Sequence, residues 1–242
     1  MNNEIAEAIE KARAAYNVVA AAYDAVTSEF QGAVIYPRII SAIEAHCASL
    51  AGLRVLDLGC GSGGLIKILH AQGAIVAGVD ISATFIARAR SQGLPVYEAS
   101  MHSLPFPDHS FDAIVSNFAI NYLPPSGQRM ALEEALRVLR PRGICVISLM
   151  HPWLLRNGKY FEPEHQKTIV LLGEEFTLHI LDWPEIINMF VESGFIIRTL
   201  IDADIPQDLD QIAAHIQNPG AAQFAKSFAF MPYGMFVVAA KP

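Results

Sequence analysis

The chain of 242 residues is long enough to bury one substantial core, and with 52% hydrophobic and 17% charged residues its composition is that of a globular protein. Its net charge of −7 and the lack of a basic run argue against nucleic acid as a partner, because a duplex-binding surface needs a stripe of lysine or arginine. No apolar run reaches the roughly 20 residues that a membrane span needs, so we expect no membrane-spanning segment.

The first residues and the cysteines bear on location and on metal binding. The opening stretch MNNEIAEAIEKARAAY is acidic and amphipathic, unlike the basic and then apolar order of a secretory signal. Cys47, Cys60 and Cys145 are too few and too scattered for a disulfide framework or a zinc knuckle, and the eight histidines lack metal-binding spacing. We therefore expect a cytoplasmic protein without a metal site, either a monomer or a homodimer.

Short apolar runs alternate with helical segments along the chain, which is typical of a doubly wound α/β fold. Two helices are expected before the first strand, over Asn3–Asp24 and Tyr36–Leu50. Later helices are expected at Gly64–Ala71, Thr84–Gln92 and Gln128–Leu139, the last of them ended by Pro141 and Gly143. Strands are expected at Arg54–Leu58, Ile75–Asp80, Val96–Ala99, Asp112–Asn117, Gly143–Met150, Phe195–Ile201 and Met235–Ala240.

We expect a single domain over residues 1–242. Residues 1–50 are predicted to form a helical cover and residues 51–150 a cofactor-binding core. Residues 151–182 and 203–234 break the alternation but keep apolar and aromatic side chains. They are therefore predicted to be inserted segments that cover a substrate site at the carboxyl edge of the sheet, where such folds bind ligands.

The stretch VLDLGCGSGG has the glycine spacing of a nucleotide-binding turn, in which Gly59 and Gly61 let the backbone approach a ligand. A dinucleotide and S-adenosylmethionine both fit that spacing. Asp57 separates the two ligands, because a carboxylate repels a pyrophosphate but attracts an ammonium or a sulfonium. Asp80, at the end of the next expected strand, is placed to accept hydrogen bonds from ribose hydroxyls in either case, with Ile81 against the adenine.

Four ordered segments resemble the class I S-adenosylmethionine-dependent methyltransferases: VLDLGCGSGG, GVDIS, LPFPDHSFDAIVSNFAINYL and LRVLRPRGICVIS. They are most similar to the small-molecule branch related to the ubiquinone, menaquinone and biotin-pathway methyltransferases. The resemblance runs from about Tyr16 to Met150. It implies a Rossmann-like sheet of seven strands, mostly parallel with the last strand antiparallel, and S-adenosylmethionine as the cofactor.

The resemblance also places cofactor-binding residues outside the glycine loop. Ser100 stands where family members often carry an acidic residue that holds the adenine amino group, so the adenine contact is expected to rely on the backbone of Met101 and His102. Asn117 lies in a segment that, by resemblance, runs beneath the sulfonium. The departure at Ser100 weakens one expected contact without changing the family.

Three tyrosines near the start of the chain are further candidates for the cofactor site. Tyr16 and Tyr23, in YNVVAAAYD, are seven residues apart and therefore share one helix face. The resemblance implies that an aromatic residue of this helix closes over the methionine moiety, while simple packing of that face on the domain is the alternative. Tyr36, in IYPRII, is a similar family-like aromatic near the cofactor.

Two histidines are candidates for the acceptor side. His151 directly follows the fifth expected strand, and its imidazole is our candidate for a catalytic base, with a turn-orienting role as the alternative. His179 resembles a substrate-side histidine of the subgroup, although Ile180 stands where the family often has arginine. Aromatic residues of the inserted segments and their flanks are candidates for an apolar substrate pocket: Trp153, Tyr160, Phe161, Trp183, Phe224, Phe228, Phe230 and Tyr233.

The sequence thus predicts a methyltransferase that transfers a methyl group from S-adenosylmethionine to a small, apolar or aromatic acceptor, with oxygen as the favoured accepting atom. One alternative is a protein that keeps this fold and cofactor without methylating, as a binding or pericyclic-type protein, because fold does not fix function. A second alternative is an NAD-dependent oxidoreductase.

Overall fold

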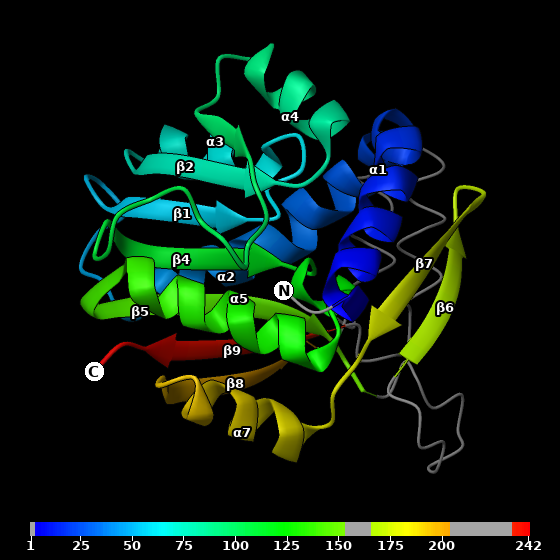
Figure 1. The fold of residues 1–242 in the computed structure, drawn as a ribbon. Coiled ribbons are helices and arrows are strands. Elements are labelled where there is room, and N and C mark those ends of the chain that lie inside the picture. Colours follow the sequence, from blue (N-terminus) through cyan, green and yellow to red (C-terminus); the bar gives the residue numbers. More distant parts are fainter. Residues whose placement is uncertain (1–2, 153–165, 204–233) are drawn as a thin grey trace.

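The computed structural model describes residues 3–152, 166–203 and 234–242. The main sheet contains β1 (Arg54–Leu58), β2 (Ile75–Asp80), β3 (Val96–Glu98), β4 (Phe111–Asn117), β5 (Leu139–Met150), β8 (Ile196–Ala203) and β9 (Gly234–Ala240). Their order across the sheet is β3-β2-β1-β4-β5-β9-β8 (Figure 1). The first five strands run parallel, and β9 is antiparallel to both neighbours, β5 and β8. The expected doubly wound sheet with an antiparallel last strand is therefore confirmed.

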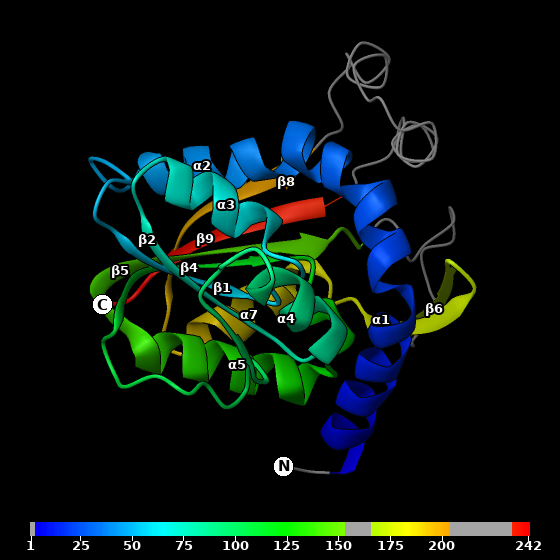
Figure 2. The same cartoon turned by 90° about the horizontal axis from the view of Figure 1, so that it is seen from above.

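Helices cover both faces of this sheet. They are α1 (Asn3–Phe30), the π-helical turn η1 (Gln31–Ile35), α2 (Tyr36–Glu44), α3 (Gly64–Ala71), α4 (Ala83–Arg90), the short 3-10 helix η2 (Ile120–Tyr122), α5 (Pro125–Val138) and α7 (Trp183–Glu192). Seen from above, α2 and α3 lie on one face and α5 and α7 on the other (Figure 2). The long helix α1 crosses beyond the carboxyl ends of the central strands. No helix of the described residues is long and apolar enough to cross a membrane.

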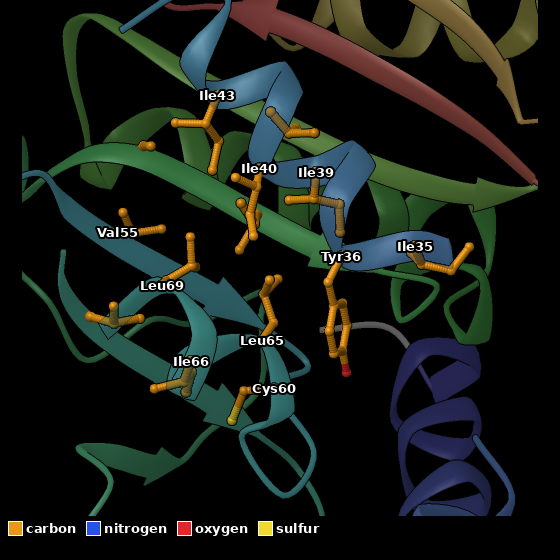
Figure 3. Close-up of a cluster of buried hydrophobic side chains, with 14 of the residues drawn as sticks. Ile35, Tyr36, Ile39, Ile40, Ile43, Val55, Cys60, Leu65, Ile66 and Leu69 are labelled. Carbon is orange, nitrogen blue, oxygen red and sulfur yellow. The ribbon is translucent and has the colours of Figure 1, made fainter. Parts of the chain in front are cut away.

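The core follows from strands that are buried on both faces. In β1, every residue after Arg54 is buried, as expected for a central parallel strand covered by helices on each side. Isoleucines of α2, among them Ile39 and Ile43, pack with Val55 of β1 and Leu69 of α3 in one cluster (Figure 3). This packing fixes the position of α2 and, with it, the position of the helical cover.

The first helix is longer than the expected Asn3–Asp24. It continues to Phe30 and passes through η1 directly into α2, which ends at Glu44 rather than at Leu50. The extension is stabilised because Phe30 and Ile35 are fully buried in the same cluster as α2. A π-helical turn inserts an extra residue into a helix and is often found at functional sites, so η1 makes this junction a place to look for ligand contacts.

The prediction that Pro141 and Gly143 end the helix before β5 was wrong, because α5 already ends at Val138. Leu139 is fully buried and pairs with Phe111 of β4, so the chain becomes extended before it reaches the proline. Both residues lie within β5, at an irregularity in the pairing with β4, and Arg142 between them has a positive φ of 65°.

A two-stranded antiparallel hairpin that the sequence did not predict lies within the first inserted segment. It consists of β6 (Gln166–Leu171) and β7 (Glu174–His179), and it lies beside α1 (Figure 1). Leu172 and Gly173 connect the strands with positive φ angles of 55° and 89°, as a two-residue hairpin turn of the primed type requires. Helix α7 follows, capped by the reciprocal hydrogen bonds of Asp182 and Glu185.

Asn121 of η2 connects this hairpin to the main sheet. Its amide nitrogen donates to the backbone oxygen of His179 (3.0 Å), and its side-chain oxygen accepts from the backbone nitrogen of Met150 (2.9 Å). The side chain is only 2% exposed, so loss of the amide would remove the bond to the Met150 nitrogen and one of the two donors to the His179 oxygen, which also accepts from Gln128.

We expect Asn121→Ala to lower the free energy of unfolding by about 1–3 kcal/mol, measured by urea denaturation. The matched control is Asn188→Ala, at an exposed position of α7, which should change stability little. Equal stability of the two variants would show that Asn121 does not stabilise this junction.

Candidate active site

A cavity of about 250 Å³ lies at the carboxyl ends of β1, β2 and β4 and is bounded by α1 and η1. The sheet edge is where parallel α/β folds bind ligands. His102 is not among the described lining residues of this cavity, but the structure brings the other eleven sequence-predicted cofactor residues to it, and their individual roles toward a ligand remain predictions. They are Tyr16, Tyr23, Tyr36, Asp57, Gly59, Gly61, Asp80, Ile81, Ser100, Met101 and Asn117.

The glycine loop forms one wall of the cavity because its backbone adopts conformations that other residues avoid. Gly59 has a φ of 75°, and a Cβ atom placed on it would lie 2.3 Å from the Cβ of Ala119. Gly61 has a φ of 53°, and its amide donates to Oδ2 of Asp80 (2.9 Å). The hydrogen bond from Gly61 to Asp80 of β2 thus fixes the conformation of the loop beside the cavity.

Asp57 is the least compensated polar group of the cavity. Its carboxyl is 2% exposed, and Oδ1 has no hydrogen-bond partner among the described residues. Burial, followed by the negative charge of Asp80, raises the pKa of this carboxyl to about 7. No lysine, arginine or histidine of the described residues lines the cavity, so a positively charged ligand group is the partner that this carboxylate lacks.

Asp80 organises the turn between β2 and α4. Besides the bond from Gly61, its Oδ1 accepts from the backbone nitrogen of Ser82 (2.8 Å). Burial raises the pKa of Asp80, and the backbone hydrogen bonds oppose that shift. Each carboxylate oxygen can accept more than one hydrogen bond, so both oxygens keep capacity for a ligand hydroxyl.

The three predicted tyrosines form the upper part of the cavity wall. Tyr16 donates its hydroxyl proton to the hydroxyl of Tyr122 (2.5 Å), and Tyr36 donates to Oε1 of Gln31 in η1 (2.7 Å). The Nε2 of Gln31 in turn donates to the hydroxyl of Tyr23 (3.4 Å). Burial raises the pKa of all four tyrosines, so each remains a protonated, neutral phenol near neutral pH.

The sequence interpretation missed two residues whose polar contacts connect α1 to the elements that form the site. Asp24 accepts from the hydroxyl of Ser62 in the glycine loop (2.9 Å) and forms an ion pair with Arg88 of α4 (2.9 Å). Asn17 accepts from the hydroxyl of Ser82 (2.7 Å). Both residues lie in the stretch YNVVAAAYD, where each directly follows a tyrosine, so these two polar positions were the available signal.

Tyr122 was also missed, although it lies with Asn117 in the family-like segment LPFPDHSFDAIVSNFAINYL. Asn117, at the end of β4, accepts from the hydroxyl of Ser148 in β5 (2.9 Å). Phe118 follows with a positive φ of 52°, a strained backbone conformation for an aromatic residue and one that is characteristic of functional sites. On the opposite side of the cavity, Ser100 is hydrogen-bonded to Nδ1 of His102 (2.5 Å).

The acceptor-side candidates are not all brought to this cavity. His151 is half-buried at the end of β5, with its ring edge-on to Trp183 (centroids 6.2 Å apart), and it is not among the lining residues. His179 is buried and lines a second, smaller cavity on the hairpin side of α1. The remaining aromatic candidates lie outside the described residues: Trp153, Tyr160, Phe161, Phe224, Phe228, Phe230 and Tyr233.

Comparison with known proteins agrees with this geometry. Residues 56–147 match the methyltransferase domain family. The chain is 30% identical to an uncharacterized protein of Methanocaldococcus jannaschii over 67% of this chain and 72% of that protein. It is 38% identical to a demethylmenaquinone methyltransferase of Clavibacter sepedonicus over 46% of this chain, and it spans only about half (48%) of that enzyme.

A solved structure shows the same fold. The crystal structure of an S-adenosylmethionine-dependent methyltransferase of Mesorhizobium loti is similar with a TM-score of 0.62 at 24% identity, over 83% of this chain and 96% of that one. The chain therefore belongs to the class I S-adenosylmethionine-dependent methyltransferases, and S-adenosylmethionine is its cofactor. This assignment displaces the NAD-dependent alternative.

The residues present fit this cofactor. The Oδ1 atom of Asp57, which has no hydrogen-bond partner among the described residues, is suited to an ammonium group, and a dinucleotide does not carry such a group. The missing side chain at Gly59 lets Ala119 pack directly against the loop, where a Cβ atom would lie 2.3 Å from the Cβ of Ala119. Six aromatic side chains and, among the described residues, no lysine, arginine or histidine line the cavity, which suits a nucleoside without phosphates.

The raised pKa of Asp57 predicts how cofactor affinity depends on pH. An ammonium group binds the ionised carboxylate, so affinity for S-adenosylhomocysteine should fall by about tenfold per pH unit below a pH of about 7. Calorimetric titrations from pH 5.5 to 8 measure this slope.

The slope should disappear in Asp57→Asn, whose affinity should also be lower than that of the wild type at pH 8. Asp108→Asn, at an exposed carboxyl outside the cavity, is the matched control and should keep the wild-type slope. An unchanged slope in Asp57→Asn would show that another group meets the ligand's ammonium.

Proposed function

We propose that the protein transfers the methyl group of S-adenosylmethionine to a small aromatic or otherwise apolar acceptor, with a hydroxyl oxygen as the favoured nucleophile. The observation that carries this proposal is the buried carboxylate of Asp57, whose Oδ1 has no hydrogen-bond partner among the described residues. It lies in a cavity whose described lining includes six aromatic side chains and no lysine, arginine or histidine. The cytoplasmic location and the monomeric or homodimeric state expected from the sequence are part of the same proposal.

The donor side follows from the geometry of the loop. Asp57, Gly59 and Gly61 would hold the amino-acid end of the cofactor, and Asp80 would accept hydrogen bonds from its ribose hydroxyls. When bound, the cofactor supplies an activated methyl group on a sulfonium. The part of the protein is then to orient this group, since positioning can provide most of the acceleration of a displacement reaction.

The adenine end of the donor would lie toward β3. Ile81 would pack against the ring, while the backbone of Met101 and the hydroxyl of Ser100 would supply hydrogen bonds. Asn117 would lie near the sulfonium, with its side chain oriented by Ser148. Tyr16, Tyr23 and Tyr36 would cover the methionine moiety from α1, η1 and the start of α2.

The acceptor side of the cavity is aromatic, with Tyr16, Phe85, Phe118 and Tyr122 among its lining residues. Because the tyrosines stay protonated, they provide hydrogen-bond donors without a negative charge. An acceptor hydroxyl would attack the methyl carbon in line with the carbon–sulfur bond, which breaks as the carbon–oxygen bond forms. The hydroxyl proton must then pass to a base or to water.

A methyl-transfer assay tests the function itself. Radiolabelled S-adenosylmethionine is incubated with a panel of phenols, hydroxylated heterocycles and aromatic amines, and both labelled product and S-adenosylhomocysteine are measured. We expect product with at least one member and at least a hundredfold lower kcat/KM in Asp57→Asn. Tight binding of S-adenosylhomocysteine without product on any acceptor would favour the non-methylating alternative.

His151 is our candidate for the base, because it follows β5 at the same sheet edge as Asn117. For a hydroxyl acceptor, His151→Ala should lower kcat by about a hundredfold and remove the imidazole step from the pH profile of kcat. The control is His70→Ala, at an exposed position of α3.

His151→Asn separates a catalytic role from a packing role. Asparagine keeps a polar side chain beside Trp183 but cannot take up a proton. If His151 is the base, the His151→Asn and His151→Ala variants should therefore show equally low kcat. If His151→Asn retains full turnover, the residue only shapes the turn before Pro152, and water accepts the proton.

A further inference from the structure

A second cavity, of about 180 Å³, lies between α1 and the β6–β7 hairpin. It is separate from the proposed donor site but not isolated from it, because Ala12 and Tyr122 line both cavities. A molecule that occupies both spaces would have to pass between them beside Ala12 and Tyr122. The remaining lining residues are Glu4, Glu7, Ala8, Lys11, Gln166, Phe176, Thr177 and His179.

The least satisfied polar group of this second cavity is the ring of His179. The residue is only 4% exposed, and neither ring nitrogen has a hydrogen-bond partner among the described residues. Its backbone oxygen accepts from both Asn121 and Gln128 (3.0 Å each), which holds the residue in place. The residue lines the cavity, so a ligand that enters the cavity can supply the partner that the ring lacks.

The protonation state of His179 determines what it can bind. Burial lowers the pKa of the imidazole, and the negative charge of Glu4 opposes this only in part. The ring is therefore neutral near pH 7 and offers one nitrogen as a hydrogen-bond acceptor. That nitrogen suits a ligand N–H group.

The charges around this cavity favour a cation. Glu4 and Glu7 are exposed, three residues apart on α1, and neither has an ion-pair partner within the described part of the chain. Apart from His179, Lys11 is the only basic residue among the described lining residues, and its ammonium donates to the hydroxyl of Thr177 in β7 (2.9 Å). Two carboxylates against one ammonium, on a chain of net charge −7, attract positive ligands.

The wall shared by the two cavities is aromatic. Phe176 of β7 contacts Tyr16 (centroids 4.8 Å apart) and Tyr122 (5.8 Å), and the two tyrosines are joined by their hydroxyls. Aromatic faces stabilise an aromatic ligand body by stacking and an ammonium by cation–π attraction. One small molecule with an aromatic ring and an amine could pack its ring against Phe176 and Tyr122 and place its amine near Glu4, Glu7 and His179.

We propose that the second cavity holds the amine end of the methyl acceptor, whose class is then a small aromatic molecule with a basic amine. Glu4 and Glu7 attract the ammonium, His179 accepts a hydrogen bond from it, and the ring lies against Tyr122 and Phe176 with its methyl-accepting atom directed into the large cavity. This inference rests on the proposed function, which it makes more specific.

Calorimetric titration of the full chain, saturated with S-adenosylhomocysteine, tests the inference with phenethylamine as the probe. The matched probes are 2-phenylethanol and 3-phenylpropanoate, which keep the ring and change only the polar end. We expect phenethylamine to bind at least tenfold more tightly than either. Equal affinity for the amine and the alcohol, or no binding of the amine, overturns the proposal.

Variants locate the binding. Glu4→Gln combined with Glu7→Gln should weaken phenethylamine binding by roughly fivefold, as expected for two exposed charges. Glu44→Gln, an exposed glutamate of α2 outside both cavities, is the control and should change nothing. Equal affinities of the double variant and the control contradict recognition by these carboxylates.

A nitrogen-15 spectrum of the histidine side chains gives a readout that does not depend on mutation of the cavity. The ring signals of His179 should shift when phenethylamine is added, and unchanged signals overturn its role. Failure of these amine experiments with intact S-adenosylhomocysteine binding and methyl transfer would refute only this inference. Amine binding without methyl transfer to any acceptor would instead contradict the proposed function.

Discussion

The arrangement of the site depends on two carboxylates that share one cavity in which no described residue supplies a positive charge. Asp57 and Asp80 end or nearly end adjacent parallel strands, and both are surrounded by apolar and aromatic residues. Their folded-state pKa values are raised, so the folded chain holds their protons more tightly than the unfolded chain does. Stability from these groups is therefore lost as pH rises toward 7, and a bound cation offsets that loss. The same property that destabilises the free protein makes the site selective for a positively charged nucleoside.

The carboxylate of Asp80 also connects the glycine loop to the helical cover. It holds Gly61 and the backbone of Ser82, while the hydroxyl of Ser82 reaches Asn17 of α1. A parallel connection runs from Ser62 to Asp24. Because the loop and α1 are fastened to each other, a ligand that displaces the loop also acts on the cover. The cover is thus part of the binding site rather than a separate helical domain.

Much of this could be predicted from the sequence, because the relevant signals are local. The limits of β1, β2 and α3 follow from apolar runs bounded by Gly59, Gly64 and Asp80, and they agree with the structure residue for residue. Signals of other kinds were misread. Pro141 suggested a helix end, yet burial of Leu139 had already ended the helix, and Leu172–Gly173 is a weak turn signature beside the common Asn-Gly.

The candidate site was predictable where a residue's chemistry is tied to a motif, as for Asp57 and Asp80. It was not predictable where function arises from contact between distant segments. Asp24, Gln31 and Tyr122 carry no motif of their own, and they reach the cavity only because α1 continues through η1 and because η2 follows β4. The second cavity is of the same kind, since it requires α1 and a hairpin that is more than 150 residues away in the sequence.

Tyr122, together with Ala12, belongs to the described walls of both cavities. It bonds to Tyr16 through its hydroxyl and follows Asn121, which fixes the end of β7. Asn121 therefore sets the position of the hairpin and of His179, and its neighbour Tyr122 bounds the large cavity. A shift of η2 would move both walls together. This coupling gives a physical reason why the small 3-10 helix after β4, rather than the glycine loop, would determine which acceptor the protein accommodates.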